Sequence, residues 1–220
     1  MRTLLWAYRP MLDDEFDTQQ RAILKFLANA AGHTRDWDIL IGLVEDDSDQ
    51  ALLDTFKRSR DEASGKNRET LTQAKLKKTL HDAVSEANRE LNTSSARTPL
   101  TKFARKRVSV AQKQLKKRMR VASKTHGSDY ASYHEVRKAG KKVRYLIEFF
   151  EPLLDKRKRK GLKQLKRLQK RLGMLNDVVA SRDLLKTHRA SLPDASSADK
   201  ALKALKRKQK RRMNAASKLL

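Results

Sequence analysis

The segment 132–154 gathers most of the side chains in this sequence that could bind an anion. At 100° per residue its cations and one histidine fall on one side of the helical wheel, and apolar residues fill the other side. The cationic side holds His134, Arg137, Lys138, Lys141, Lys142 and Arg144. Arginine offers a planar fork to phosphate oxygens, lysine a mobile point charge, and histidine gains charge as a phosphate approaches. The pattern indicates a phosphate-binding helix face backed by a buried one.

Charge repulsion on this face has little relief within the helix. Like charges three or four residues apart destabilise a helix by a few tenths of a kcal/mol per pair, and Arg137/Lys141 and Lys138/Lys142 are such pairs. On the wheel, Glu148 is the one acid within the stripe. The alternative is a solvated basic face with an incidental histidine. A ligand with repeated negative charge explains the stripe better.

The net charge of +26 over 220 residues points the same way. It is uneven, because residues 1–56 hold 5 basic and 11 acidic side chains and the remainder carries the whole excess. Such an excess repels itself in a compact protein, so a polyanion is expected to neutralise part of it. The candidates are nucleic acid, an anionic membrane surface and polyphosphate. A second basic helix, over 100–123, adds Arg105 and Lys116 as candidate contacts to the same anion.

The elements that must position these residues are all predicted to be helices. The chain has only 7 Gly and 4 Pro, and apolar residues recur at helical spacing between turn-rich breaks. The predicted helices are 1–9, 17–31, 35–44, 49–63, 66–91, 100–123, 130–150, 158–172, 177–189 and 198–217. Gly32 and Gly173 are predicted to cap helix ends, with Asp36 and Asp177 capping the next helices. The fold class is all-α, built from antiparallel bundles.

An internal duplication is also predicted. At an offset of 142, Arg2 and Pro10 align with Arg144 and Pro152. At an offset of 141, Gly32 aligns with Gly173 and Asp36 with Asp177. The chain 1–220 is therefore expected to form a single domain of two pseudo-symmetric halves, 1–123 and 130–220. The first half is expected to lack the start of its N-terminal helix, since the counterpart of His134 would precede residue 1.

Several classes of protein find no support in the sequence. There is no Cys, which excludes disulfides and thiol chemistry. The other histidines have no metal-ligand spacing, and no nucleophile, phosphate-loop or metalloprotease motif occurs. No signal peptide and no membrane-spanning stretch is read. We expect no catalysis, no metal, no cofactor and a cytoplasmic location.

Three segments resemble the conserved histidine α-helical domain (CHAD) family. They are HEVRKAGKKVRY (134–145), LANAAGHTRDWDIL (27–40) and LQKRLGMLNDVVAS (168–181). The resemblance covers nearly all of the chain and implies two helical halves around a basic cavity or surface that binds inorganic polyphosphate. It implies ligand contacts from the six residues of the stripe, with Arg2 as the first-half counterpart of Arg144.

Two other functions stay open beside polyphosphate binding. A sequence-nonspecific nucleic-acid-binding protein would share the charge and the salt sensitivity, although aromatic residues are only 5% of the chain. Tyr145 and Tyr133 are the only stacking candidates near the stripe. A scaffold that brings granule-associated proteins to polyphosphate granules is compatible with polyphosphate binding, and the sequence does not separate the two.

Overall fold

The computed structural model describes residues 2–93, 98–125, 129–156, 161–192 and 194–220. Within these ranges the chain is helical and has no strand. The α-helices are α1 (Arg2–Tyr8), α2 (Asp14–Val44), α3 (Gln50–Gln73), α4 (Leu76–Thr93), α5 (Leu100–Ser123), α6 (Tyr130–Phe149), α8 (Leu162–His188) and α9 (Ala195–Ser217). Short 3₁₀ turns are η1 (Arg9–Met11), η2 (Glu45–Asp47), η3 (Glu151–Leu153) and η4 (Arg189–Ser191). The all-α prediction is confirmed.

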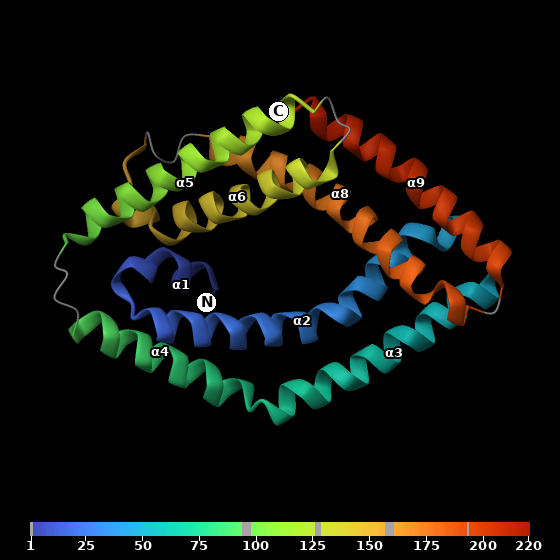
Figure 1. The fold of residues 1–220 in the computed structure, drawn as a ribbon, viewed down its shortest axis with the longest axis horizontal. Coiled ribbons are helices and arrows are strands. Elements are labelled where there is room, and N and C mark those ends of the chain that lie inside the picture. Colours follow the sequence, from blue (N-terminus) through green and yellow to red (C-terminus); the bar gives the residue numbers. More distant parts are fainter. Residues whose placement is uncertain (1, 94–97, 126–128, 157–160, 193) are drawn as a thin grey trace.

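The helices pack mainly as hairpins of sequence neighbours. α2 packs with α3, α5 with α6, and α8 with α9, and α8 joins these units because it contacts both α2 and α6. Figure 1 shows α1 lying between α2 and the α5–α6 hairpin, with α3 and α4 running along the outside. The arrangement places α6 opposite α1 and the first half of α2.

Aspartates begin four of the long helices. Asp13, Asp49, Asp129 and Asp194 each precede a helix in extended backbone and accept hydrogen bonds from backbone N–H groups of its first turn. Such caps satisfy N–H groups that have no partner within the helix and stabilise it by about 1 kcal/mol each. The cap at Asp129 fixes where α6, the helix with the cationic stripe, begins.

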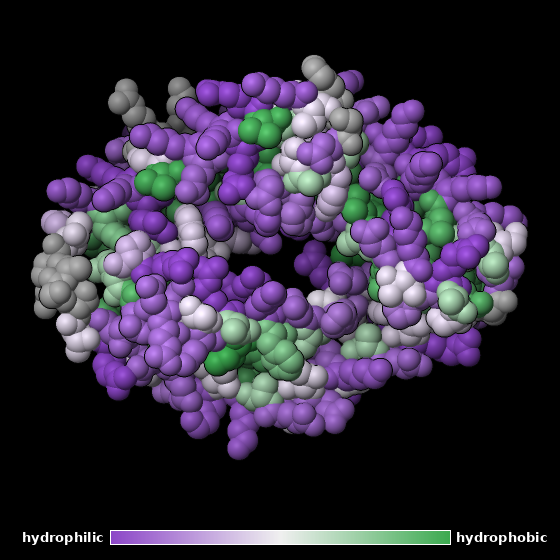
Figure 2. Space-filling model, in the orientation of Figure 1, coloured by the Kyte–Doolittle hydropathy of each residue, from purple (hydrophilic) through white to green (hydrophobic). Residues whose placement is uncertain are grey.

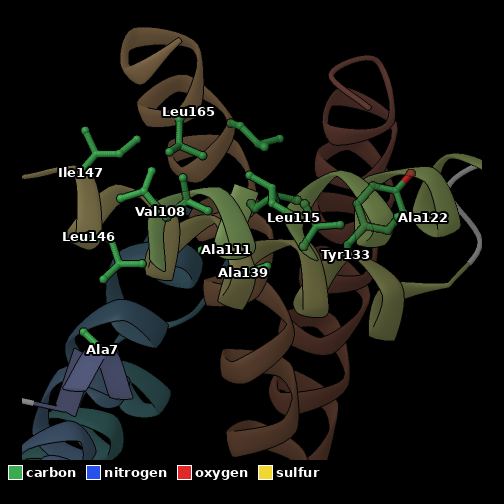
Figure 3. Packing of buried hydrophobic residues seen from close by; sticks show 14 of the residues in the cluster. Ala7, Val108, Ala111, Leu115, Ala122, Tyr133, Ala139, Leu146, Ile147 and Leu165 are labelled. Atoms are coloured by element: carbon green, nitrogen blue, oxygen red, sulfur yellow. The ribbon is translucent and has the colours of Figure 1, made fainter. Parts of the chain in front are cut away.

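The apolar face of α6 anchors that helix in the main core. Val143, Leu146 and Phe150 are 2%, 0% and 1% exposed, which confirms that the apolar side of this segment is buried. They pack in one cluster with residues of α1, α5 and α8, among them Ala7, Val108 and Leu165 (Figure 3). Burial of a whole Leu or Phe side chain stabilises a fold by roughly 1.5–3 kcal/mol. This packing can outweigh the repulsion between cations on the other face.

Two further clusters hold α2 in place. Trp37, Leu40 and Val44 from its second half pack against Phe56 of α3 and against α8 and α9. Near its start, Leu24 packs with Leu5 and Leu12, and partly buried leucines of α4 cover this group. α2 is thus fixed at both ends, and its first half faces α6 across the space between them.

The helix breaks predicted at Gly32 and Gly173 are wrong. α2 runs through Gly32 and α8 runs through Gly173, so neither glycine ends a helix and Asp36 and Asp177 lie inside helices. A glycine inside a helix costs roughly 0.5–1 kcal/mol relative to alanine. Apolar residues continue on one face on both sides of each glycine, and their burial offsets this cost.

Among the described residues, the first five elements of the first half, α1 to α3, have the same order as α6 to α9 of the second half, whereas α4 and α5 have no counterpart there. Buried residues share their register as well. At the offset of 142, η1 aligns with η3, and both hold a proline. At 141, five buried positions of α2 align with five buried positions of α8: Leu24 with Leu165, Leu27 with Leu168, Trp37 with Val178, Leu40 with Ser181, and Val44 with Leu185. This agrees with a duplication, which superposition of the two segments would test.

The crossing of α2 and α8 brings a pair of equivalent residues together. Burial raises the pKa of Asp36, and the neighbouring carboxylate of Asp177 also raises it. Asp36 and Asp177 align at the offset of 141. The proximity of two aligned residues agrees with the predicted duplication.

Candidate anion-binding site

A cleft of about 1020 Å³ lies between α1, α2, α5 and α6, and we call it the central cleft. Figure 2 shows a hollow in the middle of the molecule with a largely hydrophilic rim, in the region between α2 and α6 of Figure 1. Eight cations line the central cleft: Arg2, Arg21, Lys25, Arg118, Arg137, Lys138, Lys141 and Lys142. His134 lines it too, and Glu135 is the one carboxylate among its described lining residues. Such a surplus of cations in a concave site favours an anionic ligand.

Six of the nine residues predicted for the site line this cleft. His134, Arg137, Lys138, Lys141 and Lys142 come from α6, and Arg2 comes from α1. The helical spacing on α6 explains five of them. Arg2 joins because α1 packs against both α2 and α6.

Arg144, Arg105 and Lys116 do not line the central cleft. The Arg144 guanidinium lies 3.6 Å from the Glu148 carboxylate and 4.6 Å from the centre of the Tyr145 ring. Arg105 of α5 lies 4.0 Å from Asp155. Lys116, also of α5, lines a separate cavity of about 920 Å³ on another side of the hairpin. The expected convergence of Arg105 and Lys116 with the stripe is therefore wrong, because a helix as basic as α5 directs its cations to several faces. Arg144 belongs to α6 itself, but it lies beside Glu148 and Tyr145 and is not part of the cleft lining.

Three cations of the cleft were missed as site residues. Arg21 and Lys25 lie one turn apart on α2 and face α6 across the cleft. They lie in the segment with net negative charge, so composition gave no signal. The fold also fixes Arg21, because its guanidinium lies 4.0 Å from the buried Asp17 carboxylate. Arg118 is one of many cations on α5, and its spacing alone does not distinguish it.

The pKa of Lys142 reflects how close the cations of the cleft lie to one another. It is lowered by partial desolvation first and then by the charges of Arg118, Arg21 and Lys138. These neighbours come from α5, α2 and α6. Mutual repulsion among cations of three helices is relieved when an anion binds between them.

Glu135 connects two of these cations. Its carboxylate accepts a hydrogen bond from Arg118 of α5 through one oxygen and pairs with Lys138 through the other. Hydrogen bonding with Lys138 is the main cause that lowers the pKa of Glu135. The prediction that Glu148 is the one acid of the stripe is wrong for the cleft, because Glu135 lines it, pairs with Lys138 within α6, and Glu148 does not line it. The partner Arg118 could not be found on the wheel because it belongs to α5.

His134 is oriented by a small polar cluster. Its Nδ1 lies 3.2 Å from Oδ1 of Asn176 and 3.3 Å from the Tyr130 hydroxyl, and that hydroxyl donates to the same Oδ1 at 3.1 Å. An amide oxygen only accepts, so Nδ1–H donates to Asn176 and Nε2 is left with its lone pair. Burial lowers the pKa of His134, and the charge of Lys138 lowers it further. The neutral form of His134 is therefore favoured in the free protein, and a nearby polyanion favours the charged form.

The aromatic rings beside the cleft already have cationic partners. Arg107 and Lys142 lie 4.5 and 4.7 Å from the centre of the Trp6 ring. Lys141 and Arg144 lie over Tyr145. Tyr133 is only 1% exposed and belongs to the core. A nucleic-acid base that stacked on Trp6 or Tyr145 would have to compete with these cations.

The described ranges hold neither a metal-binding cluster nor a membrane-spanning helix. There, no group of three or more histidine, aspartate or glutamate side chains comes together as a metal site would require. No helix in the same ranges is both long enough and apolar enough to cross a membrane.

The fold is that of an all-helical domain with a cationic cleft between its helices. A family model for the CHAD domain matches residues 1–186, so the chain belongs to the CHAD family, which is associated with polyphosphate binding and is generally non-catalytic. The crystal structure of the CHAD domain from the plant Ricinus communis is similar, with a TM-score of 0.77 and 25% sequence identity over 99% of this chain and 76% of that one. None of the curated proteins matches the chain.

Proposed function

We propose that this protein binds inorganic polyphosphate in the central cleft without catalysing a reaction on it. The observation that carries the proposal is the convergence of eight cations from α1, α2, α5 and α6 around one carboxylate. Polyphosphate carries one negative charge per unit along a thin, flexible chain. Such a chain can reach cations on all walls of a cleft at once, and each contact is a charge-assisted hydrogen bond.

Nucleic acid is the second candidate, and two features of the cleft disfavour it. The cleft volume of about 1020 Å³ is that of a small-molecule pocket, which suits a bare phosphate chain better than a duplex. Single strands are bound without sequence preference by stacking bases on aromatic rings, and here Trp6 and Tyr145 lie under cations. Phosphate contacts alone would remain, and polyphosphate offers more of them per length of chain.

A competition titration of the whole chain tests the proposal. Labelled long-chain polyphosphate is displaced by unlabelled polyphosphate, single-stranded DNA and duplex DNA, each at the same concentration of phosphate groups. The salt concentration is held fixed, because counterion release makes every such affinity depend on salt. We expect unlabelled polyphosphate to displace the label at the lowest concentration. Displacement by duplex DNA at an equal or lower concentration contradicts the proposal.

The same activity would place the protein on polyphosphate granules in the cytoplasm, in contact with granule-associated proteins. A fluorescent fusion and a variant with a neutralised cleft test this part. The fusion should collect on granules, and the variant should stay diffuse. Equal recruitment of both contradicts a role of the cleft in localisation.

A further inference from the structure

Glu135 stands out because it is a carboxylate placed inside a site for polyanions. It lies in the second turn of α6, one residue after His134, and lines the central cleft. Its two oxygens interact with different cations, Arg118 of the facing helix α5 and Lys138 one turn ahead on α6. A phosphate unit would use the same two groups, since two of its oxygens can accept from an arginine and a lysine at once.

The exposure of these groups shows that the interaction can be exchanged. The side chains of Glu135, Arg118 and Lys138 are 41%, 42% and 52% exposed. Ion pairs this exposed to water contribute little to stability. The Glu135 carboxylate can therefore leave its partners at small cost when a stronger anion arrives.

We propose that Glu135 is an internal counter-anion, which occupies the place of one ligand phosphate between Arg118 and Lys138 and which bound polyphosphate displaces. This inference rests on the proposed function. It makes Glu135 a residue that limits affinity. A single phosphate gains little binding energy, because it must displace the Glu135 carboxylate to reach the same two cations. A long chain reaches the other cations of the cleft as well, so Glu135 favours long polyphosphate over short anions.

The α6 helix supplies a matched control for the test. Glu148 also lies on α6 and also pairs with two cations, Arg144 at 3.6 Å and Lys166 of α8 at 3.7 Å, but it does not line the central cleft. Glu135→Gln and Glu148→Gln remove the same charge from the same helix. The two variants differ in position, because Glu135 lies in the central cleft, where the ligand is expected, and Glu148 lies outside it.

The experiment measures binding of long-chain polyphosphate and of tripolyphosphate to the wild-type chain and both variants, at several salt concentrations. Glu135→Gln should bind long-chain polyphosphate about tenfold more tightly, which corresponds to ~1.4 kcal/mol. Its affinity for tripolyphosphate should rise by a larger factor, since the preference for long chains weakens. Its salt dependence should steepen, because Arg118 and Lys138 now release counterions on binding. Glu148→Gln should change affinity less than twofold.

The outcomes separate this inference from the proposed function. A wild-type chain that does not bind polyphosphate contradicts the proposed function, and the role of Glu135 falls with it. Where the wild type binds, either unchanged or weaker binding by Glu135→Gln overturns the counter-anion role alone. Weaker binding would show instead that Glu135 positions Arg118 for the ligand. Equal tightening by Glu148→Gln would assign the effect to net charge. Glu135→Ala, measured in parallel with thermal unfolding, repeats the test if the glutamine variant folds poorly.

Discussion

The two long walls of the central cleft carry the same chemistry on different sequence patterns. On α6, four cations fall within the six residues 137–142, directly after His134. On the facing wall, three cations are spread over α1 and α2, at Arg2, Arg21 and Lys25. The α6 wall is a local motif that exists as soon as the helix forms. The α1–α2 wall exists only once three apolar clusters have brought the helices together.

This difference predicts which wall would contribute more to the binding of an anion. The α6 cations repel one another along one helix, and the apolar face buried behind them holds them in place. Arg21 is held by a carboxylate, because Asp17 is 1% exposed and pairs with both Arg9 and Arg21. The α6 wall therefore offers more uncompensated charge to a ligand, and the α2 wall completes the enclosure.

The largest effect is expected from removing the charge of the α6 wall. Replacing Arg137, Lys141 and Lys142 with Gln keeps helix propensity and removes three contacts of about 1 kcal/mol or more each. Affinity for long-chain polyphosphate should fall at least ~100-fold, and the salt slope should flatten. Titration at fixed salt measures the loss. Thermal unfolding should change little, since relief of repulsion offsets the lost contact of Lys142 with Trp6.

A triple replacement on α9 is the control for net charge. Lys206, Lys210 and Arg211 are exposed and do not line the central cleft. Lys208 is left in place, because it donates to the carbonyl of Leu43 and lies 2.9 Å from Asp47. Equal losses from the two triple variants would mean that overall charge drives binding and that the α6 wall is no special site.

A smaller effect is expected from the opposite wall. Arg21→Gln combined with Lys25→Gln removes two cations from α2 while Arg9 still pairs with Asp17 at 3.1 Å. Affinity should fall about tenfold, as one to two contacts of ~1 kcal/mol are lost. The matched pair Lys206→Gln and Lys210→Gln should change affinity less. No loss from the α2 pair would show that the ligand lies on α6 alone and that the cleft is not enclosed.

His134 provides a third test, because it lies on the α6 wall and the α1–α2 wall has no histidine in the cleft. Its pKa in the free protein lies below the ordinary value of 6.5, and a bound polyanion raises it by favouring the charged form. Affinity should therefore be highest below the free-state pKa and fall as pH rises through the higher pKa of the complex. We expect a few-fold change, measured by titration at a series of pH values and one salt concentration.

His134→Gln should remove this pH dependence and leave the affinity near that of the wild type at neutral pH. Long-chain polyphosphate is the suitable ligand, because its internal units do not titrate in this range. A variant that keeps the full pH dependence would assign it to another group. Tyr130→Phe, which removes one neighbour of Nδ1, should keep the dependence with a shifted midpoint.

Much of this architecture could be predicted from local sequence patterns. Apolar spacing predicted the helical class and the buried face of α6, and the stripe predicted five cleft residues. These features depend on contacts within one helix and its own core face. Arg2 followed from the resemblance, and α1 does place it in the cleft.

The missed features depend on contacts between helices. Arg21 and Lys25 face the cleft because α2 crosses opposite α6, and Arg118 is distinguished from its neighbours by its partner Glu135. The periodicity of one helix does not reveal which of its faces turns toward a neighbouring helix. The prediction for Arg105 and Lys116 was wrong for the same reason. Their charge suggested a contact with the ligand, but their positions on α5 direct them away from the cleft. The prediction that the two glycines end helices was wrong because burial of apolar residues on both sides of each glycine outweighs its preference for a helix end.

The smallest effect, on stability alone, tests whether the two walls belong to equivalent repeats. Gly32 of α2 and Gly173 of α8 align, both lie inside helices, and a Cβ at either would meet nothing within 4 Å. Gly32→Ala and Gly173→Ala should each raise the free energy of unfolding by about 0.5–1 kcal/mol, with unchanged affinity for polyphosphate. Gly161→Ala is the opposite control, because φ is +90° there and alanine should lower stability by roughly 1–2 kcal/mol. Denaturant unfolding of the three variants measures these changes. Loss of stability at both Gly32 and Gly173 would indicate the helix ends predicted from the sequence, and a gain at only one would show that the repeats have diverged at this position.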